Sequence, residues 1–225
     1  MTLLLTNDDG IDAPGIRALL KCVSERAVIV APVAELSGCS HQVTTGEPIR
    51  VEWRTADEYA VTGTPADCVR LGVKHLCPEA KLVIAGINSG GNMGVDAYIS
   101  GTIAAVREAA FLGIPGIAIS QYRKGGRPID WELTVARTAY VLSELMMNLP
   151  KPGTFWNVNL PYLEPGDPEP DIIFCEPSTE PLPVKFRVEG DNFYYEGRYE
   201  MRDRSPGSDV DVCFSGNIAV TKISL

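Results

Sequence analysis

Short apolar segments alternate with helical patterns over the first two thirds of the chain. Apolar runs of only a few residues are typical of strands that are buried on both faces of a sheet. Because helical segments separate these runs, the sequence predicts β-α-β units around a mostly parallel sheet. We therefore expect an α/β fold with helices flanking the sheet. The expected strands cover residues 3–5, 28–31, 82–85, 117–119 and 156–160.

The helical segments carry start signals and apolar stripes. Pro14 suits the first turn of a helix, and Thr64 followed by Pro65 predicts an N-cap and a first-turn proline. A third helix is expected at about residues 102–112. A fourth is predicted by apolar residues spaced three or four apart, namely Val135, Ala139, Leu142, Met146 and Leu149.

The character of the chain changes at about Pro161. Prolines become frequent and aromatic residues alternate with charged ones, which predicts β-hairpins, loops and an arm. The tail has too few apolar residues for a core of its own. We therefore expect a core at residues 1–161 and a C-terminal extension at 162–225 that packs on it. Its aromatic residues should cover a second subunit in a homodimer or homotetramer, and they are Phe186, Phe193, Tyr194, Tyr195 and Tyr199.

Composition argues against several classes of protein. The net charge of −9 over 225 residues disfavours a nucleic acid polymer as partner, because such binding needs clustered Lys and Arg. Only His41 and His75 are present, so no zinc site built from histidines is expected. The six cysteines form no C-x-x-C pair, which favours reduced thiols. With no bilayer-length apolar run and no basic leader, we expect a cytoplasmic protein without a membrane partner.

Two adjacent carboxylates, Asp8 and Asp9, follow the first expected strand. Ligands of open α/β sheets bind beyond the carboxyl ends of the strands, so these side chains lie where a site is expected. Adjacent carboxylates repel each other unless a positive group lies between them, and oxygen ligands suit a hard divalent cation. The alternative is an ordinary Asp-Gly turn at Asp9 and Gly10.

A Gly-rich loop at residues 86–94 follows the third expected strand. Its glycines let the backbone approach a ligand closely, and Asn88 and Asn92 supply amide groups for a metal or a phosphate. The tripeptide at residues 100–102 (SGT) precedes a helix, whose N-terminus favours an anion. A flexible surface loop and an ordinary N-cap at Ser100 are the alternatives. Neither a G-x-G-x-x-G pattern nor a P-loop lysine is present.

These motifs together resemble the SurE family of stationary-phase survival proteins, which are metal-dependent 5′-nucleotidases. The resemblance runs in chain order from residue 1 to about residue 161. The matching segments are residues 7–15 (NDDGIDAPG), 31–32 (AP) with 37–38 (SG), 63–68 (GTPADC), 86–94 (GINSGGNMG), 100–102 (SGT) and 157–161 (NVNLP).

The resemblance implies a Rossmann-like α/β domain that hydrolyses nucleoside 5′-monophosphates and, in some members, 3′-nucleotides or short polyphosphate. It also implies one divalent cation per subunit, Mg²⁺ or Mn²⁺, with Ca²⁺ as a substitute in crystals. By motif, the implied metal ligands are Asp8, Asp9, Ser37 and Asn88, the phosphate-binding residues are Asn92, Ser100, Gly101 and Thr102, and the catalytic residues are Asp8, Asp9 and Asn92.

The chain departs from the family pattern in two places. Ala85 stands where the family commonly has Ser, a change that hardly touches catalysis. The tail is shorter and less regular than the usual substrate-side and oligomerisation region, which bears on substrate preference and assembly.

Other functions stay open from the residues alone. A non-catalytic nucleotide- or phosphate-binding regulatory module on the same fold would not need both aspartates. If the chain is an enzyme, Asp8 or Asp9 could act as nucleophile or base, so attack by water and an aspartyl-phosphate intermediate are both open. A serine hydrolase built on Ser40 and His41 is disfavoured, because there is no G-x-S-x-G elbow.

Overall fold

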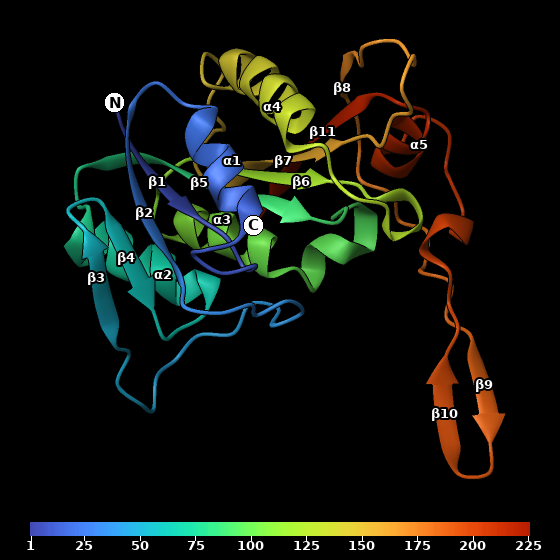
Figure 1. Ribbon diagram of the computed structural model, residues 1–225, viewed down its shortest axis with the longest axis horizontal. Coiled ribbons are helices and arrows are strands. Elements are labelled where there is room, and N and C mark those ends of the chain that lie inside the picture. The colour runs from blue at the N-terminus through green and yellow to red at the C-terminus, as the bar shows by residue number, and fades with distance from the viewer.

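The computed structural model describes residues 1–225 and contains one large sheet with helices on both faces (Figure 1). Its nine strands lie in the order β3-β4-β2-β1-β5-β6-β7-β11-β8. Neighbouring strands from β4 to β7 are parallel, which confirms the expected α/β fold. The strands are β1 (Thr2–Thr6), β2 (Arg26–Pro32), β3 (Val51–Thr55), β4 (Glu58–Val61), β5 (Ala80–Ser89), β6 (Gly116–Gln121), β7 (Thr154–Leu160), β8 (Ile172–Phe174) and β11 (Ile218–Ser224).

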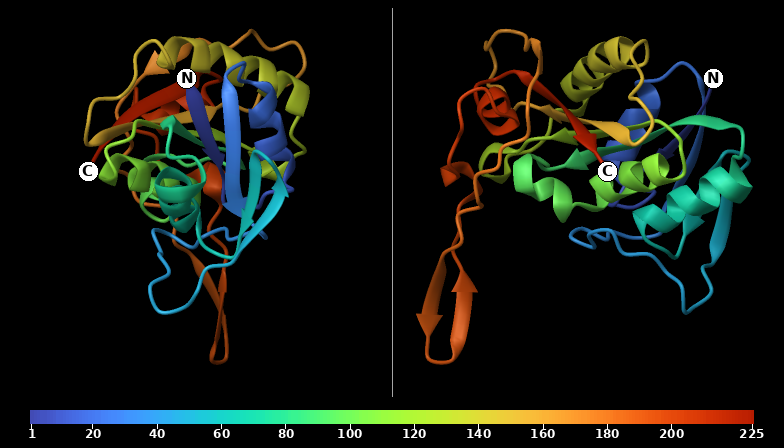
Figure 2. Two further views of the ribbon diagram at one scale, coloured as in Figure 1. Left: turned by 90° about the vertical axis from the view of Figure 1, so that its left-hand side faces the viewer. Right: turned by 180° about the vertical axis from the view of Figure 1, so that it is seen from behind.

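Helices α1 and α4 cover one face of the sheet, and α2 and α3 cover the other (Figure 2). The helices are α1 (Pro14–Lys21), α2 (Pro65–Leu71), α3 (Gly101–Phe111), α4 (Trp131–Leu145) and α5 (Asp209–Phe214). Shorter 3₁₀ segments cover Gly94–Tyr98, Lys124–Gly126 and Tyr199–Met201, and a π-helical turn covers Gly72–Leu76. None of these helices is long and apolar enough to cross a membrane.

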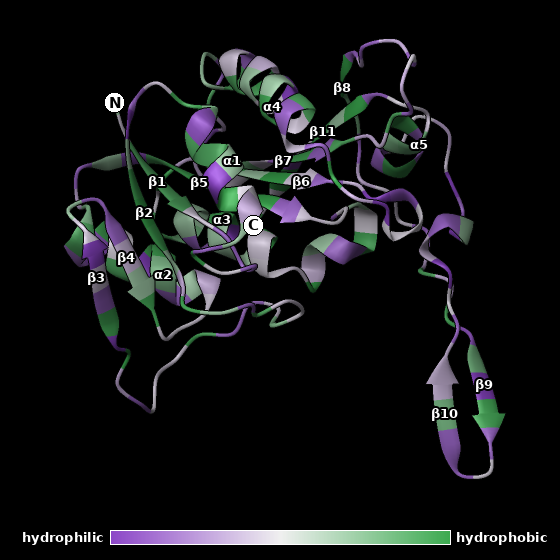
Figure 3. Cartoon of the chain, in the orientation of Figure 1, coloured by the Kyte–Doolittle hydropathy of each residue, from purple (hydrophilic) through white to green (hydrophobic).

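Strands β1, β2 and β5 are buried on both faces, as their unbroken apolar runs predict. Within β1, Leu3 and Leu5 belong to the core beneath α1 and α4, while Leu4 belongs to the core beneath α2 and α3. All three side chains are fully buried. The same strands are mostly green in the hydropathy colouring of Figure 3. Because successive side chains of a strand point to opposite faces of the sheet, each apolar run contributes to two cores.

The predicted helix starts are confirmed. Pro14 occupies the first turn of α1. Thr64 caps α2 within a capping box, because its side chain accepts from the Asp67 N–H and the Asp67 carboxylate accepts from the Thr64 N–H. Ser100 caps α3 by accepting a hydrogen bond from Ile103 N at 3.2 Å.

Two predicted boundaries differ from the structure. The Gly-rich loop begins inside β5, which continues to Ser89 after a register shift beyond Ala85. Gly86 permits this path, because a Cβ there would lie only 2.4 Å from the Ile119 carbonyl oxygen. Helix α4 ends at Leu145, so Met146 is its C-cap and Leu149 lies beyond it. Strands β3 and β4 were not expected from the sequence.

The C-terminal part of the chain contributes to the main sheet and also projects from it. Strand β11 lies between β7 and β8, so residues on both sides of position 161 belong to one sheet. Strands β9 (Phe186–Glu189) and β10 (Asn192–Tyr195) form a separate antiparallel hairpin. This hairpin extends away from the body of the molecule in Figures 1 and 2.

Candidate active site

The candidate site lies where the strand order reverses. The chain passes from β1 to β2 on one side, and β5 returns to pair with β1 on the other side. A crevice at the carboxyl ends of two such strands is the usual ligand site of an open α/β sheet. Asp8 and Asp9 follow the end of β1 after one residue, and Asn88 lies in the last residues of β5. The fold thus brings two separate motifs together.

A cleft of about 480 Å³, the phosphate-side cleft, opens at this edge of the sheet. Six of the predicted site residues line it, and these are Asp8, Asp9, Ser37, Asn88, Asn92 and Ser100. The other two, Gly101 and Thr102, lie behind Asp8 in the first turn of α3. Lining residues that were not predicted include Glu35, Asp96, Arg123 and Tyr199.

Asp8 is the buried member of the carboxylate pair, with 4% of its surface exposed. The Thr102 hydroxyl donates a hydrogen bond to Asp8 Oδ1 at 2.5 Å. Burial raises the pKa of Asp8, and the hydrogen bond from Thr102 partly offsets that rise. Gly101 leaves room for this packing, since a Cβ there would lie 2.9 Å from the Asp8 Cβ. Asp8 is thus held in one orientation from α3.

Asp9 is half-buried and has weaker support than Asp8. Its Oδ2 accepts a hydrogen bond from the Ser89 N–H at 3.4 Å. Burial, followed by the negative charge of Asp8, raises the pKa of Asp9 to about 6. A positive ion between the two carboxylates would remove the repulsion that contributes to this shift.

Asn88 and Ser37 supply neutral oxygens to the cleft. The Asn88 side-chain amide donates to the Gly90 carbonyl at 2.9 Å, and its own carbonyl oxygen accepts no hydrogen bond from the protein. Ser37 is exposed, and its hydroxyl donates to Glu35 at 2.8 Å. Both oxygens therefore have unused capacity to accept hydrogen bonds or coordinate a cation.

Asn92 is held by a buried amide network that was not expected from the sequence. Its backbone N–H donates to Asn159 Oδ1 at 2.7 Å, and its carbonyl accepts from the side chains of Asn157 and Asn159 at 2.8 and 3.0 Å. Its side-chain amide donates to the Ser120 hydroxyl at 2.8 Å. Both asparagines lie on β7, within the segment 157–161 that matched a known motif. The network positions Asn92 at the cleft wall.

The C-terminal tail also holds the Gly-rich loop. Asp96 Oδ2 accepts from the Tyr199 hydroxyl at 2.6 Å and from the guanidinium of the buried Arg202 at 2.8 Å. Asp209 Oδ2 accepts from the Gly94 N–H at 2.7 Å. These contacts join positions about a hundred residues apart, and no local sequence signal marks them. The loop after β5 is therefore fixed by residues 199–209.

The donor set at the cleft fits a hard divalent cation. No three His, Cys, Asp or Glu side chains gather into a metal cluster, so carboxylates alone do not complete a site. Asp8 and Asp9 nevertheless share the cleft with the unpaired Asn88 carbonyl oxygen and the Ser37 hydroxyl. Such an all-oxygen set, completed by water, suits Mg²⁺, Mn²⁺ or Ca²⁺ rather than a soft metal.

The fold and these side chains define a Rossmann-like α/β protein whose site combines paired carboxylates, amides and the N-terminus of a helix. The chain belongs to the SurE family, since the family model for survival protein SurE matches residues 3–180. This family membership confirms the resemblance seen in the sequence.

Similar proteins cover nearly the whole chain. A protein of Nostoc sp., provisionally named 5′-nucleotidase alr3139, is 58% identical over 99% of both chains. The 5′-nucleotidase SurE of Methylobacterium radiotolerans is 36% identical over 100% of this chain and 93% of its own. The crystal structure of SurE protein from Aquifex aeolicus superposes with a TM-score of 0.87 at 31% identity, covering 100% of this chain and 93% of that one.

Proposed function

We propose that this chain is a divalent-cation-dependent phosphomonoesterase that hydrolyses nucleoside 5′-monophosphates to nucleosides and phosphate. SurE family membership and relatives named 5′-nucleotidase support the nucleotidase activity. The observation that carries the proposal is the phosphate-side cleft, which is lined both by Asp8 and Asp9 and by Ser100 at the start of α3. Carboxylates for a cation and N–H donors for an anion are the two parts that phosphate ester hydrolysis needs.

We assign the cation to Asp8, Asp9, Ser37 and Asn88. When bound there, Mg²⁺ or Mn²⁺ would polarise a phosphoryl oxygen and lower the pKa of a coordinated water. Thr102 keeps Asp8 in place through its hydrogen bond at 2.5 Å.

We assign the phosphate to Asn92 and the start of α3 in the same cleft. The Ser100 hydroxyl lines the cleft, and it and the N-terminus of α3, where Gly101 and Thr102 form the first turn, favour the phosphoryl group. Asn92 contributes its amide group from a position fixed by the β7 asparagines. These donors offset charge that develops on the equatorial oxygens as the ester bond breaks.

Asp9 is our candidate for the base or nucleophile, because it is the more accessible carboxylate of the pair. Rapid quenching with a labelled 5′-mononucleotide separates the two roles. A trapped acid-stable phosphoenzyme whose phosphoryl group maps to Asp9 in the digested protein would assign the nucleophile. Its absence in a reaction with normal turnover would leave attack by water.

Phosphate release from a substrate panel tests the proposed function. The panel contains 5′-mononucleotides, 3′-nucleotides and short polyphosphate, each with EDTA and then with excess Mn²⁺ or Mg²⁺. We expect release from 5′-mononucleotides only with the cation, and Asp9→Asn should lower kcat/KM by at least about 100-fold. Full activity in EDTA would contradict the cation. Nucleotide binding without any hydrolysis would favour the regulatory module.

We also propose that the β9–β10 hairpin contacts a second copy of the chain in a homodimer or homotetramer. Its aromatic side chains are exposed, with 50% of Phe186 and 66% of Phe193 accessible in the single chain. Exposed aromatic residues on a projecting hairpin are typical of an interface.

A further inference from the structure

A second cavity, the Trp131 cavity, adjoins the phosphate-side cleft. It has a volume of about 510 Å³ and includes Asp12, Pro14, Ile129 and Trp131 among its lining residues. Four residues line both cavities, so the two form one continuous depression across the sheet edge. The shared residues are Asp9, Glu35, Ser89 and Arg123. A cavity of this size is within the range of small-molecule sites.

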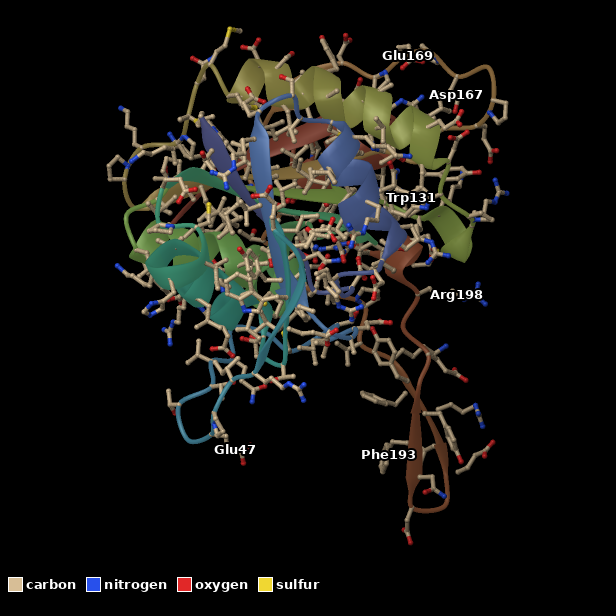
Figure 4. All side chains as sticks on the ribbon, turned by 60° about the vertical axis from the view of Figure 1, so that its left-hand side comes forward. Glu47, Trp131, Asp167, Glu169, Phe193 and Arg198 are labelled. Atoms are coloured by element: carbon tan, nitrogen blue, oxygen red, sulfur yellow. The ribbon has the colours of Figure 1, made fainter.

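Trp131 forms the aromatic wall of this cavity. It is the first residue of α4, and its Cη2 lies 3.3 Å from the position that a Cβ on Gly15 would take, so the ring packs beside α1 (Figure 4). The side chain is half-buried, and the indole N–H donates to no acceptor in the protein. Ile129 extends the apolar surface. An anchored ring with a free N–H donor can bind a planar heterocycle.

The other aromatic side chain at the site is already occupied by protein contacts. Tyr199 donates its hydroxyl to Asp96, and the Arg202 guanidinium lies over its ring at 5.0 Å. Its ring also packs near Phe214 and Tyr122, with centroids 6.2 Å from each. Of these two aromatic side chains, Trp131 is therefore the one whose ring is free for a ligand to stack on.

Charge sets the orientation of a ligand that spans the two cavities. Asp12 and Glu35 place carboxylates at the Trp131 cavity, which disfavours a phosphate there and leaves acceptors for hydroxyl groups. Arg123 lies at the junction, where its guanidinium donates to the Gly126 carbonyl at 2.6 Å and to the Ser89 hydroxyl at 3.3 Å. These contacts fix a positive group beside the site of the phosphate ester.

We propose that the Trp131 cavity binds the nucleoside end of the substrate, with the base stacked on the Trp131 indole and the sugar beside Arg123. The inference rests on the proposed function, because it takes the phosphate to lie in the phosphate-side cleft. It makes Trp131 a specificity-determining residue that favours nucleotides over phosphate esters without a base. Stacking on an aromatic side chain is tolerant of base identity, so purines and pyrimidines should both bind.

Paired substrates test this assignment. For Trp131→Ala, kcat/KM for adenosine 5′-monophosphate should fall roughly 5- to 100-fold, while kcat/KM for ribose 5-phosphate stays unchanged. Trp131→Phe retains an aromatic face and should recover most of the loss. The matched control is Trp53→Ala, which removes an indole that is 69% exposed on β3 at the far edge of the sheet. Equal losses for both substrates in Trp131→Ala would overturn the proposal.

Equilibrium binding of adenosine separates this inference from the nucleotidase activity. Calorimetry in EDTA needs neither the cation nor hydrolysis. Weaker adenosine binding in Trp131→Ala than in wild type and Trp53→Ala supports the nucleoside site, even if no ester is hydrolysed. Identical adenosine binding in all three proteins overturns it, even if nucleotidase activity is intact. Thermal unfolding of each variant checks that α4 still packs.

Discussion

Asp8 and Asp9 are neighbours in sequence, but they differ in burial and in hydrogen bonding. Asp8 is buried and receives the Thr102 hydrogen bond, whereas Asp9 is half-buried and has a single long backbone contact at 3.4 Å. Burial is the main reason that both pKa values are raised. Thr102 in the tripeptide motif at 100–102 therefore positions Asp8, in addition to the phosphate binding that we propose for this motif. From the sequence alone, the motif was expected to bind phosphate or to provide an ordinary N-cap.

Cation affinity should depend on pH through Asp9. Because its pKa in the free protein is raised to about 6, a proton occupies this carboxylate at lower pH and competes with the cation. Affinity is therefore complete well above pH 6 and is lost as the pH falls through 6. We expect the dissociation constant for Mn²⁺, measured by calorimetry, to rise roughly tenfold between about pH 7.5 and about pH 5.

Two variants check the origin of this pH dependence. Asp9→Asn should bind Mn²⁺ weakly at every pH, with the slope largely removed. Asp191→Asn changes an exposed carboxylate in the turn of the hairpin and should retain the wild-type slope. A wild-type affinity that stays constant from pH 7.5 to 5 would show that Asp9 is not a ligand.

The elements that the sequence predicts well are those with an unbroken apolar run or a strong start signal. Strands β1, β2 and β5 are buried on both faces, so almost any residue with a polar side chain would be costly there. Pro14, Thr64 and Ser100 mark helix starts through local chemistry that needs no tertiary contact. The candidate site motifs could be placed from the sequence because they come at the ends of these elements.

The missed elements have weak local signals. Strand β3 is at the edge of the sheet and is exposed along most of its length, so no apolar pattern marks it. Helix α5 has only six residues, too few for a helical period. Arg123, Trp131 and Tyr199 reach the site from distant elements, and only the fold brings them to one edge. Their roles could not be predicted from spacing.

Ser100 caps α3 and also lines the phosphate-side cleft, so replacing it should affect both the stability of the protein and its binding of phosphate. Ser100→Ala removes the N-cap of α3 and should lower the free energy of unfolding by about 1 kcal/mol, measured in urea. It also removes a hydroxyl donor to phosphate, so the inhibition constant of inorganic phosphate should rise roughly threefold to tenfold. The control, Thr64→Ala, removes the N-cap of α2 instead, at a residue that does not line the cleft. It should reduce stability alone, and an equal rise in its inhibition constant would refute a direct contact.

At the scale of the whole molecule, the C-terminal tail both holds the wall of the cleft and contributes a strand to the main sheet. Residues 199–209 hold the loop after β5 through Asp96 and Gly94, and β11 completes the sheet beside β7. The hairpin that precedes them is exposed and packs on no other part of the chain in Figure 1. Because the hairpin leads directly into Tyr199, a partner that holds the hairpin would also restrain the cleft wall.

The hairpin should carry the subunit interface. Phe186 and Phe193 contact each other edge to face, with centroids 6.5 Å apart, and their outer surfaces face solvent. In an assembly these rings would be buried, so replacing both by Ser should raise the dissociation constant at least tenfold, measured by sedimentation. Tyr140→Ser is the control, since this ring on α4 is 57% exposed but lies on the body of the molecule. A wild-type chain that sediments as a monomer at micromolar concentration would refute the assembly. Unchanged association in the double variant would indicate that the interface lies on another surface. Trp53 and its neighbours on β3 would then be the next residues to replace.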